Sequence, residues 1–171
     1  MRFVQYFKDW IWDIFVNGIV SSYFIHFKVR NIIYKILGMN NISTKCAIHS
    51  RCYISGKNLE IKRYSYINKN CLLDAKHAYI RIGEKVGIGY NCQLITTNHD
   101  YSNSEKRTGK IVAKDITIED GCWIGAGVTI NPGVTIGRGC VVASGSVVVK
   151  NCEADCLYAG VPAKLVKKLD N

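Results

Sequence analysis

Aliphatic residues recur at every sixth position over most of this chain, and this period limits the folds open to it. The unbroken part of the repeat has its aliphatic residues at Val112, Ile118, Ile124, Ile130, Ile136, Val142 and Val148. An amphipathic helix repeats near every 3.6 residues and a strand every second residue, so neither explains a step of six. Hexapeptide periodicity is typical of a β-solenoid, in which three units of one short strand and one corner close a coil of about 18 residues.

The repeat begins well before this unbroken part. Earlier units start at Ile42, Ile48, Ile54, Ile61, Ile67, Leu73, Ile82, Ile88 and Leu94. The first residue of each unit is expected to point into the prism and to stack on its equivalent one coil away. An irregular stretch separates Leu94 from Val112, and we expect it to leave the solenoid as a loop excursion over residues 99–111.

Seven of the eight cysteines occupy one position of the repeat, four residues after the aliphatic that starts a unit. They are Cys46, Cys52, Cys71, Cys92, Cys122, Cys140 and Cys152. This position is expected to face inward, where only a small side chain fits, and a free cysteine behaves as a small buried hydrophobe. No C-x-x-C pair occurs, so a structural zinc site has little support. We therefore expect reduced thiols in the core, which suits a cytoplasmic protein.

The first 40 residues differ from the repeat, because they are rich in aromatic residues and contain no proline. The stretch 10–27 is apolar, but Asp13, Asn17 and His26 interrupt it, and a membrane-spanning helix needs about 20 mostly apolar residues. No small-residue cleavage site follows, which argues against a signal peptide. We expect one or two amphipathic helices that end near Gly38 and cap the solenoid. The alternative is that residues 1–27 rest on a membrane surface.

The charge of the chain restricts its partners. Its 171 residues include 23 Lys and Arg against 13 Asp and Glu, a net charge of +10. Such a balance favours polyanionic partners: nucleic acid, anionic lipid or a phosphorylated cofactor. No dense Lys/Arg run of the kind found in nucleic-acid-binding arms occurs, so we expect no nucleic-acid partner. A solvated basic surface is the alternative.

The segment IEDGCWIGAGVTINPGVTIGRGCVVASGSVVVKN, followed by AGVPAKLVKKL, resembles the hexapeptide-repeat acyltransferases. Within that family it resembles the galactoside and maltose O-acetyltransferases and those of surface-polysaccharide synthesis, over residues 17–169. The resemblance implies an all-β solenoid, a left-handed parallel β-helix. We expect a helical cap over 1–40, the β-helix over 41–157 with the excursion 99–111, and a tail over 158–171. Because Pro162 ends the solenoid, the tail is expected to form a short C-terminal helix over AKLVKKL.

His99, in the stretch TTNHDYS, is the candidate catalytic residue. Transfer of an acyl group from a thioester to a hydroxyl needs a base that takes the hydroxyl proton, and histidine titrates near neutral pH. In the resembled family the histidine that precedes the WIG segment is the general base, and His99 holds that place. A solvated loop histidine is the alternative, and His26, His49 and His77 carry no such motif. A carbonic anhydrase of the γ type would need three zinc-binding histidines, and no histidine follows His99, so we expect no metal.

The resemblance also implies residues for the acceptor and for acetyl-coenzyme A. Polar residues one coil below the histidine bind the sugar in the family, which points here to Asn70 and Asp74, with capping of the solenoid corners as the alternative. Asp100 either orients the imidazole or turns the loop, and we favour the loop role. The family's pantetheine arm lies in a groove between two solenoids of a trimer. By motif match its residues are Trp123, Gly125, Ala126, Ser144 and Gly145, with Lys150, Lys164 and Lys167 near the phosphates.

Within that groove, the backbone N–H of Ala126 is the candidate donor to the oxyanion, and Trp123 flanks the reactive end of the arm. For the three lysines, an ordinary solvated surface is the alternative.

Together these observations predict an acetyl-coenzyme A-dependent O-acetyltransferase that acts on a sugar or glycan precursor by direct transfer. We expect a homotrimer with active sites between subunits, in the cytoplasm or peripheral at the inner face of the membrane. Two alternatives stay open: a non-sugar acceptor such as serine or an antibiotic, and a non-catalytic scaffold or membrane-bound assembly module of a polysaccharide cluster.

Overall fold

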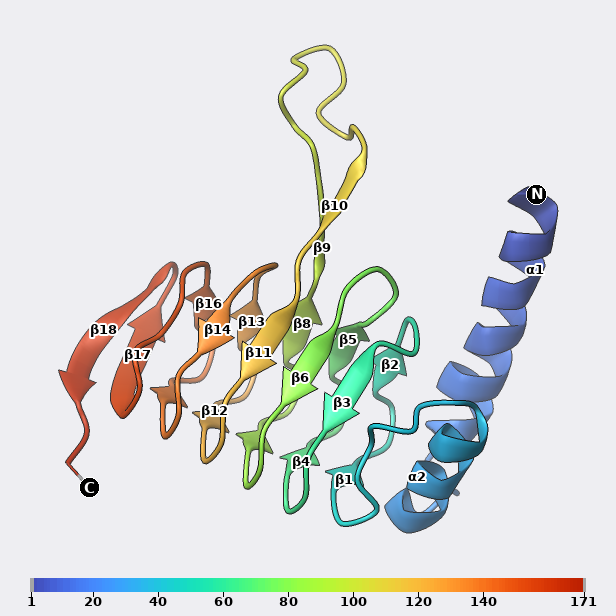
Figure 1. The fold of residues 1–171 in the computed structure, drawn as a ribbon, viewed down its shortest axis with the longest axis horizontal. Helices are drawn as coiled ribbons and strands as arrows, with labels where there is room; N and C mark the ends of the chain where they lie inside the picture. The colour runs from blue at the N-terminus through green and yellow to red at the C-terminus, as the bar shows by residue number, and fades with distance from the viewer. Residues whose placement is uncertain (1, 171) are drawn as a thin grey trace.

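The computed structural model describes residues 2–170, which form a helical layer at one end of a parallel β-helix (Figure 1). Three sheets make the sides of the prism. Sheet 1 contains, in order, β1 Ala47–Ile48, β4 Tyr66–Ile67, β7 Gly87–Ile88, β12 Trp123–Ile124, β15 Val141–Val142, β17 Cys156–Gly160 and β18 Ala163–Lys168. Sheet 2 contains β2 Tyr53–Ile54, β5 Leu72–Asp74, β8 Gln93–Ile95, β13 Thr129–Ile130 and β16 Val147–Val148. Sheet 3 contains β3 Leu59–Ile61, β6 Ile80–Ile82, β11 Ile116–Ile118 and β14 Thr135–Ile136.

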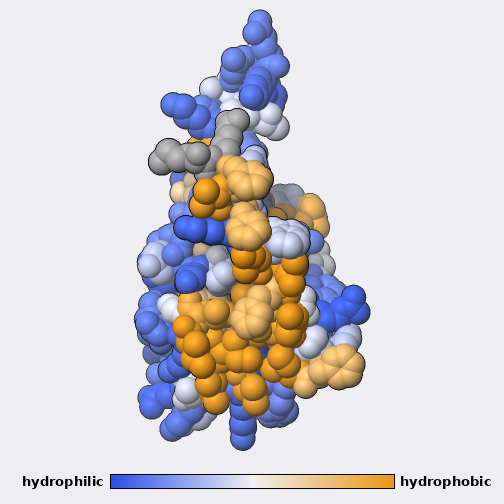
Figure 2. Space-filling view, turned by 90° about the vertical axis from the view of Figure 1, so that its right-hand side faces the viewer, coloured by the Kyte–Doolittle hydropathy of each residue, from blue (hydrophilic) through white to orange (hydrophobic). Residues whose placement is uncertain are grey.

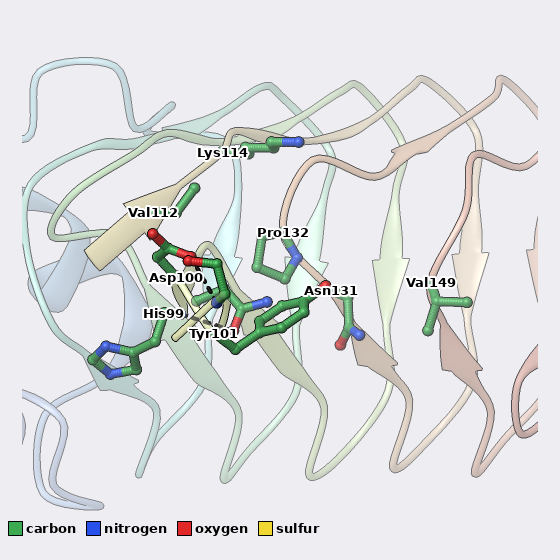
Figure 3. A pocket seen from close by; sticks show the side chains of 10 residues that line it. His99, Asp100, Tyr101, Val112, Lys114, Asn131, Pro132 and Val149 are labelled. Carbon is green, nitrogen blue, oxygen red and sulfur yellow. Dashed lines mark hydrogen bonds between the residues drawn. The ribbon is translucent and has the colours of Figure 1, made fainter. Parts of the chain in front are cut away.

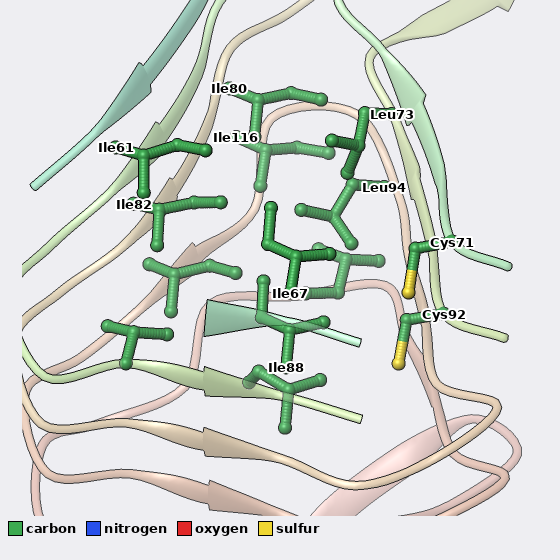
Figure 4. Packing of buried hydrophobic residues seen from close by; sticks show 14 of the residues in the cluster. Ile61, Ile67, Cys71, Leu73, Ile80, Ile82, Ile88, Cys92, Leu94 and Ile116 are labelled. Carbon is green, nitrogen blue, oxygen red and sulfur yellow. The ribbon is translucent and has the colours of Figure 1, made fainter. Parts of the chain in front are cut away.

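The aliphatic repeat forms the core. Strands of successive coils pair in parallel and in register, so that Ile67, Ile88 and Ile124 stand directly above one another in sheet 1. Figure 4 shows the same stacking for Ile61 on Ile82 and for the cysteine column. The unit-starting aliphatics from Ile42 to Val148 are at most 1% exposed, apart from Val112. The six-residue period is therefore confirmed as the period of an inward-facing column.

Val112 does not belong to that column, which corrects its place in the repeat. It is 43% exposed and lies in β10 Ile111–Ala113, which pairs antiparallel with β9 Thr97–His99. These two strands form a hairpin that projects from the prism (Figure 1), so Val112 has no inner face to pack against. The solenoid resumes at β11, where Ile116 and Ile118 are buried.

All eight cysteines are free and buried, which confirms the prediction for the seven in the repeat; Cys156, which lies beyond the repeat, is buried as well. Several thiols also donate weak hydrogen bonds to a carbonyl of the adjacent coil. Cys52 Sγ lies 3.2 Å from Asn68 O, Cys92 Sγ 3.1 Å from Gly125 O, and Cys122 Sγ 3.1 Å from Gly137 O. A thiol is small enough for the slot and can satisfy one more carbonyl there, which alanine or valine cannot.

The helical layer covers the N-terminal end of the prism with α1 Arg2–Trp12, the π-helix η1 Asp13–Val20 and α2 Phe27–Ile36. Gly38 ends α2 as expected: its φ is +94°, and its N–H donates to Lys35 O at 2.9 Å. The N–H of Met39 donates to Tyr34 O at 2.9 Å, so both bonds close the last turn. Among residues 2–170, no helix has the length and apolar composition needed to cross a membrane.

The expected C-terminal helix over AKLVKKL is wrong, because this segment is β18. It runs antiparallel to β17 after a turn at residues 160–163. The last coil leaves the backbone groups of β17 at an open sheet edge, and pairing with β18 satisfies them. A helix of seven residues would have to form without comparable partners and would be marginal in water.

Candidate active site

Two corners of the prism carry most of the predicted site residues. The hairpin corner joins sheet 2 to sheet 3 through residues 55–58, 75–79, 96–115, 131–134 and 149–151. The glycine corner joins sheet 1 to sheet 2 through residues 49–52, 68–71, 89–92, 125–128 and 143–146. The strands of sheet 2 separate these corners.

The β9–β10 hairpin is fixed to the solenoid by Asp74, which belongs to the coil below it. One carboxylate oxygen of Asp74 accepts the N–H of Thr97 at 3.0 Å, and the other accepts the hydroxyl of Ser55 at 3.0 Å. The hydroxyl of buried Thr96 donates to the carbonyl of Asp74 at 2.5 Å. Asp74 therefore ties three successive coils together at the root of the hairpin, and its carboxylate contacts the backbone that leads to His99.

His99 ends β9 at the base of the loop, and its ring is oriented by that loop. Its Nδ1 lies 3.0 Å from the carbonyl oxygen of Gly109. A carbonyl only accepts, so Nδ1 carries the hydrogen in this contact, and the neutral ring then keeps its lone pair on Nε2. Figure 3 shows the ring turned toward the N-terminal end of the prism, with Asn131 and Val149 on the other side of the hairpin.

Gly109 is a residue of this site that the sequence reasoning missed. Its N–H donates to Asp100 O at 3.0 Å, and the N–H of Asp100 donates to Lys110 O at 2.8 Å. A Cβ at position 109 would lie 2.5 Å from the Asp100 carbonyl oxygen, so only glycine allows this close approach. The signal in the sequence was a single glycine in a polar loop, which does not reveal that its carbonyl meets an imidazole.

Asp100 has the loop role. Its carboxylate accepts the N–H of Ser102 at 3.0 Å in an Asx turn, and this hydrogen bond holds the pKa of the Asp100 carboxyl below its usual range. Asp100 therefore shapes the loop whose Gly109 carbonyl meets the His99 ring.

Beside the hairpin lies a cavity of about 450 Å³. Its lining residues come from the hairpin, its loop and the coils above: Asn98, His99, Asp100, Tyr101, Ser102, Val112, Lys114, Asn131, Pro132 and Val149. It extends along the hairpin corner toward the C-terminal coils (Figure 3). The stem of Lys114 lies over Gly133 of the next coil, where a Cβ would be 3.0 Å from Lys114 Cδ. Lys150 follows the lining residue Val149 at this corner, so two exposed lysines, Lys114 and Lys150, lie at or beside the cavity. The sequence reasoning named Lys150 and missed Lys114 and Asn131.

The glycine corner carries the residues assigned to the cofactor arm. Gly125, Ala126, Ser144 and Gly145 stack there in two adjacent coils, and a Cβ on Gly125 would lie 2.5 Å from Ser144 N. Gly145 donates its N–H to Ala126 O at 2.8 Å. Among the described residues, the N–H groups of Ala126 and Ser144 have no backbone acceptor, and both residues are exposed. This corner thus carries two backbone donors without a backbone acceptor among the described residues.

The remaining predicted residues fall into three groups. Asn70 stands two coils below Ala126 at the glycine corner with φ +62°, the left-handed conformation that this corner repeats at Asn91 and Gly127. Trp123 is exposed on sheet 1, three residues before Ala126. On β18, Lys164 lies next to the turn whose Gly160 N–H donates to Ser146 Oγ at 3.1 Å, and Lys167 lies further along, opposite Leu157.

Within one chain these groups do not form one site. His99, Asp74, Asp100 and Lys150 belong to the hairpin corner, whereas Asn70, Ala126 and Ser144 belong to the glycine corner. The cysteines offer no accessible nucleophile at either corner, because the hairpin corner contains none and the three at the glycine corner, Cys52, Cys71 and Cys92, are buried. Among residues 2–170, no three His, Cys, Asp or Glu side chains lie close enough to hold a metal ion.

Comparison with known proteins places the fold in a family. The family model "Bacterial transferase hexapeptide (six repeats)" matches residues 115–150. A putative acetyltransferase of Schizosaccharomyces pombe is 39% identical over 117 residues, 68% of this chain and 56% of that protein. A galactoside O-acetyltransferase of Lactococcus lactis is 31% identical over 134 residues, 77% of this chain and 64% of that protein. The chain spans about half the length of the curated relatives that it matches first.

A solved structure matches over nearly the whole chain. The hexapeptide-repeat-containing acetyltransferase of Vibrio cholerae is 30% identical, with a TM-score of 0.81 over 96% of this chain and 90% of that one. A crystal structure of the same protein in complex with acetyl-coenzyme A gives a TM-score of 0.71 at 32% identity, over 83% and 77%. With this identity and structural similarity over almost the full length, the chain belongs to the hexapeptide-repeat acetyltransferases.

Proposed function

We propose that this protein transfers the acetyl group of acetyl-coenzyme A to a hydroxyl of a sugar or glycan precursor, with His99 as general base. The observation that carries the proposal is the contact between His99 Nδ1 and the Gly109 carbonyl, because it leaves Nε2 free to accept a proton. The named relatives support the reaction class: one is a galactoside O-acetyltransferase, and the Vibrio cholerae protein binds acetyl-coenzyme A.

The transfer is direct. His99 Nε2 takes the hydroxyl proton while the hydroxyl oxygen attacks the thioester carbonyl carbon, giving a tetrahedral oxyanion. The carbon–sulfur bond then breaks, and the protonated Nε2 returns the proton to the coenzyme A thiolate. The Ala126 N–H is our candidate donor to the oxyanion, because it has no backbone acceptor among the described residues and Ala126 is exposed. No acyl-enzyme is needed, since the thiols are buried in the core.

The cavity beside the hairpin is proposed to receive the coenzyme A arm. It runs along a corner at which Lys114 and Lys150 are exposed, and a chain with a net charge of +10 favours the anionic phosphates. Lys164, near the glycine corner, is a further candidate to contact the coenzyme A phosphates. Asn70 remains our candidate for the acceptor at that corner, while the Asp74 carboxylate is used to anchor the hairpin.

The separation of the two corners supports a homotrimer. His99 of one subunit would face the Ala126 and Ser144 donors of its neighbour across a groove, and closed rings are usual for homo-oligomers. We propose a cytoplasmic protein of polysaccharide biosynthesis, and the eight reduced, buried thiols suit that compartment.

The test follows coenzyme A release by chromatography over hexoses, aminosugars, nucleotide sugars and serine. His99→Ala should lower turnover by about 10²–10⁴-fold, the usual effect of removing a general base. His26→Ala, which changes an exposed histidine at the start of α2, is the matched control and should keep wild-type turnover. Unchanged turnover in His99→Ala would remove His99 as the base, and a preference for serine would overturn the sugar acceptor.

A further inference from the structure

The N-terminal helices are oriented with their apolar sides outward. Exposed apolar side chains of residues 3–36, which we call the end face, cover the N-terminal end of the prism. Figure 2 looks at this end and shows them gathered into one continuous area. Phe24 is 99% exposed and Ile36 79% exposed. A large continuous patch of exposed apolar side chains is rare on a soluble monomer and marks an interaction site.

On α1 and η1, the side that faces the protein makes polar contacts in addition to burying Val16 and Val20 of η1. Trp12 Nε1 donates to Ile54 O at 2.6 Å, and the Asn17 side chain bonds both the N–H and the carbonyl of Ile54, at 2.8 and 3.2 Å. Asp13 accepts from the Tyr53 hydroxyl at 2.9 Å, and Asp9 pairs with Lys76 at 2.7 Å. These contacts fix the rotation of the helix. Its opposite side, with Phe7, Trp10, Ile14 and Phe15, is turned to solvent.

On α2, polar side chains again face the solenoid while apolar ones face the solvent. Arg30, Asn31 and Tyr34 are buried against the solenoid, while Val29 and Ile32 are exposed. The Arg30 guanidinium donates to four carbonyls, among them Val20 O at 2.8 Å and Ile48 O at 2.6 Å. This side chain therefore locks α2 to η1 and to the first coil. The two helices are held so that their apolar sides form one surface.

The charges around the end face are nearly all positive. Apart from the buried Arg30, residues 1–59 carry Lys and Arg at positions 2, 8, 28, 35, 45, 51 and 57, against only Asp9 and Asp13. Both acids are engaged on the protein side, in the contacts with Lys76 and Tyr53. Lys8 and Lys28 are exposed on the helices. Arg51 and Lys69 lie within 6 Å of the exposed ring of Tyr23, at 5.7 and 5.4 Å from its centroid.

An apolar area with aromatic residues and a cationic rim is complementary to an anionic lipid surface. Tryptophan and tyrosine, here Trp10, Tyr6 and Tyr23, are the side chains enriched at the level of lipid headgroups. A second copy docked by the same face would place the lysines of one rim against those of the other, because a two-fold interface is self-complementary. The charge thus favours lipid over self-association.

We propose that the end face binds peripherally to the surface of an anionic phospholipid bilayer, with the solenoid standing away from it. The apolar side chains of α1, η1 and α2 enter the headgroup–acyl boundary, and the rim lysines contact lipid phosphates. This binding does not depend on acetyl transfer, since both candidate corners lie along the sides of the prism.

The test is flotation of the full chain with vesicles of phosphatidylcholine alone or mixed with phosphatidylglycerol. We expect binding to the mixed vesicles that weakens in high salt and is about tenfold or more weaker on phosphatidylcholine alone. The variant Phe7→Ser/Trp10→Ser/Phe24→Ser should lose about tenfold or more in binding, because it removes three exposed apolar side chains. Lys8→Glu/Lys28→Glu should lose binding chiefly at low salt.

The matched control is Val161→Ser/Leu165→Ser/Val166→Ser, which removes three exposed apolar side chains at the other end of the molecule. It should bind vesicles like the wild type, and thermal unfolding should show that both triple variants are folded. Equal binding by the two triple variants, or no binding by the wild type at low salt, would overturn the proposal. Sedimentation without lipid supplies a further check: a fall in mass caused only by the end-face variant would assign the face to a second copy.

Discussion

At the scale of single residues, the orientation of the His99 ring depends on a backbone carbonyl rather than on a carboxylate. Asp100, the neighbouring acid, is engaged with Ser102, and the ring is held by Gly109. A carbonyl partner fixes the tautomer without adding a negative charge beside the imidazole.

Gly109→Ala is therefore expected to impair the reaction without touching a substrate. The new Cβ would lie 2.5 Å from the Asp100 carbonyl oxygen, so the loop must shift and the ring loses its partner. We expect kcat to fall by about 10- to 100-fold, the size of effect that follows from a misplaced reacting group, with a changed pH profile of kcat. Ser104→Ala, in the same loop, is the control. Equal kcat values in the two variants would contradict this role for Gly109.

Arg30 ties the helical layer to the first coil of the solenoid. It is 1% exposed and has four carbonyl partners, at 2.6–2.8 Å. Arg30→Met should lower the free energy of unfolding by about 3–5 kcal/mol, because it leaves buried acceptors unsatisfied. Arg30→Lys has one ammonium group in place of the planar guanidinium, so its free energy of unfolding should lie between those of the wild type and of Arg30→Met. Urea denaturation measures both, and a loss below about 1 kcal/mol in Arg30→Met would contradict this account.

At the scale of elements, two of the buried cysteines, Cys46 and Cys122, give the solenoid a pH dependence. Burial raises the pKa of Cys122 to about 12 and that of Cys46 to about 11, above the ordinary value of 9.0. A thiol whose pKa is raised by folding contributes its full stability below pH 9, and this contribution is lost as the pH rises toward the folded-state value.

Cys122→Val tests this at one position, since Val128 and Val134 fill the equivalent slot in other coils. Between about pH 8 and about pH 10.5, the wild type should lose roughly 1–2 kcal/mol of unfolding free energy more than the variant. Urea denaturation at both pH values gives the difference. An identical pH dependence of the two proteins would show that the Cys122 thiol does not titrate on unfolding.

The elements also show what the sequence can predict. The column from Ile42 to Val148 and the cysteine slot follow from one geometric rule, repeated coil after coil, and both are confirmed. Val112 fits the spacing by chance, because a hairpin strand also tolerates valine. The segment AKLVKKL has a helix-forming composition, and it becomes β18 because β17 offers an unpaired edge, which no local pattern reveals.

At the scale of the whole molecule, the candidate site is divided between two corners. The sequence could not show that His99 and Ala126 of one chain lie at different edges of the prism. Nor could it show that Gly109, Lys114 and Asn131 meet the hairpin, because these approaches depend on how coils stack. The proposed function then requires a neighbouring subunit to complete the site.

Subunit mixing tests this requirement. His99→Ala removes the base, and Ala126→Trp is expected to block the groove, so each homotrimer should be inactive. Co-refolding equal amounts should restore about one quarter of the wild-type activity per site, because a site works only when its base and its groove come from intact surfaces of different subunits. Mixtures that stay as inactive as either parent would show that one chain supplies the whole site.

The order of strands in sheet 2 also sets the distance between His99 and the end face. β8, which leads into the His99 hairpin, lies two rungs from β2, on which η1 rests. Two rungs span about 10 Å and a layer of helices about another 10 Å, so the base stands roughly 20 Å from the end face. With that face on a bilayer, the coils act as a spacer between headgroups and acceptor. One more coil inserted before β8 would raise the reaction by about 5 Å.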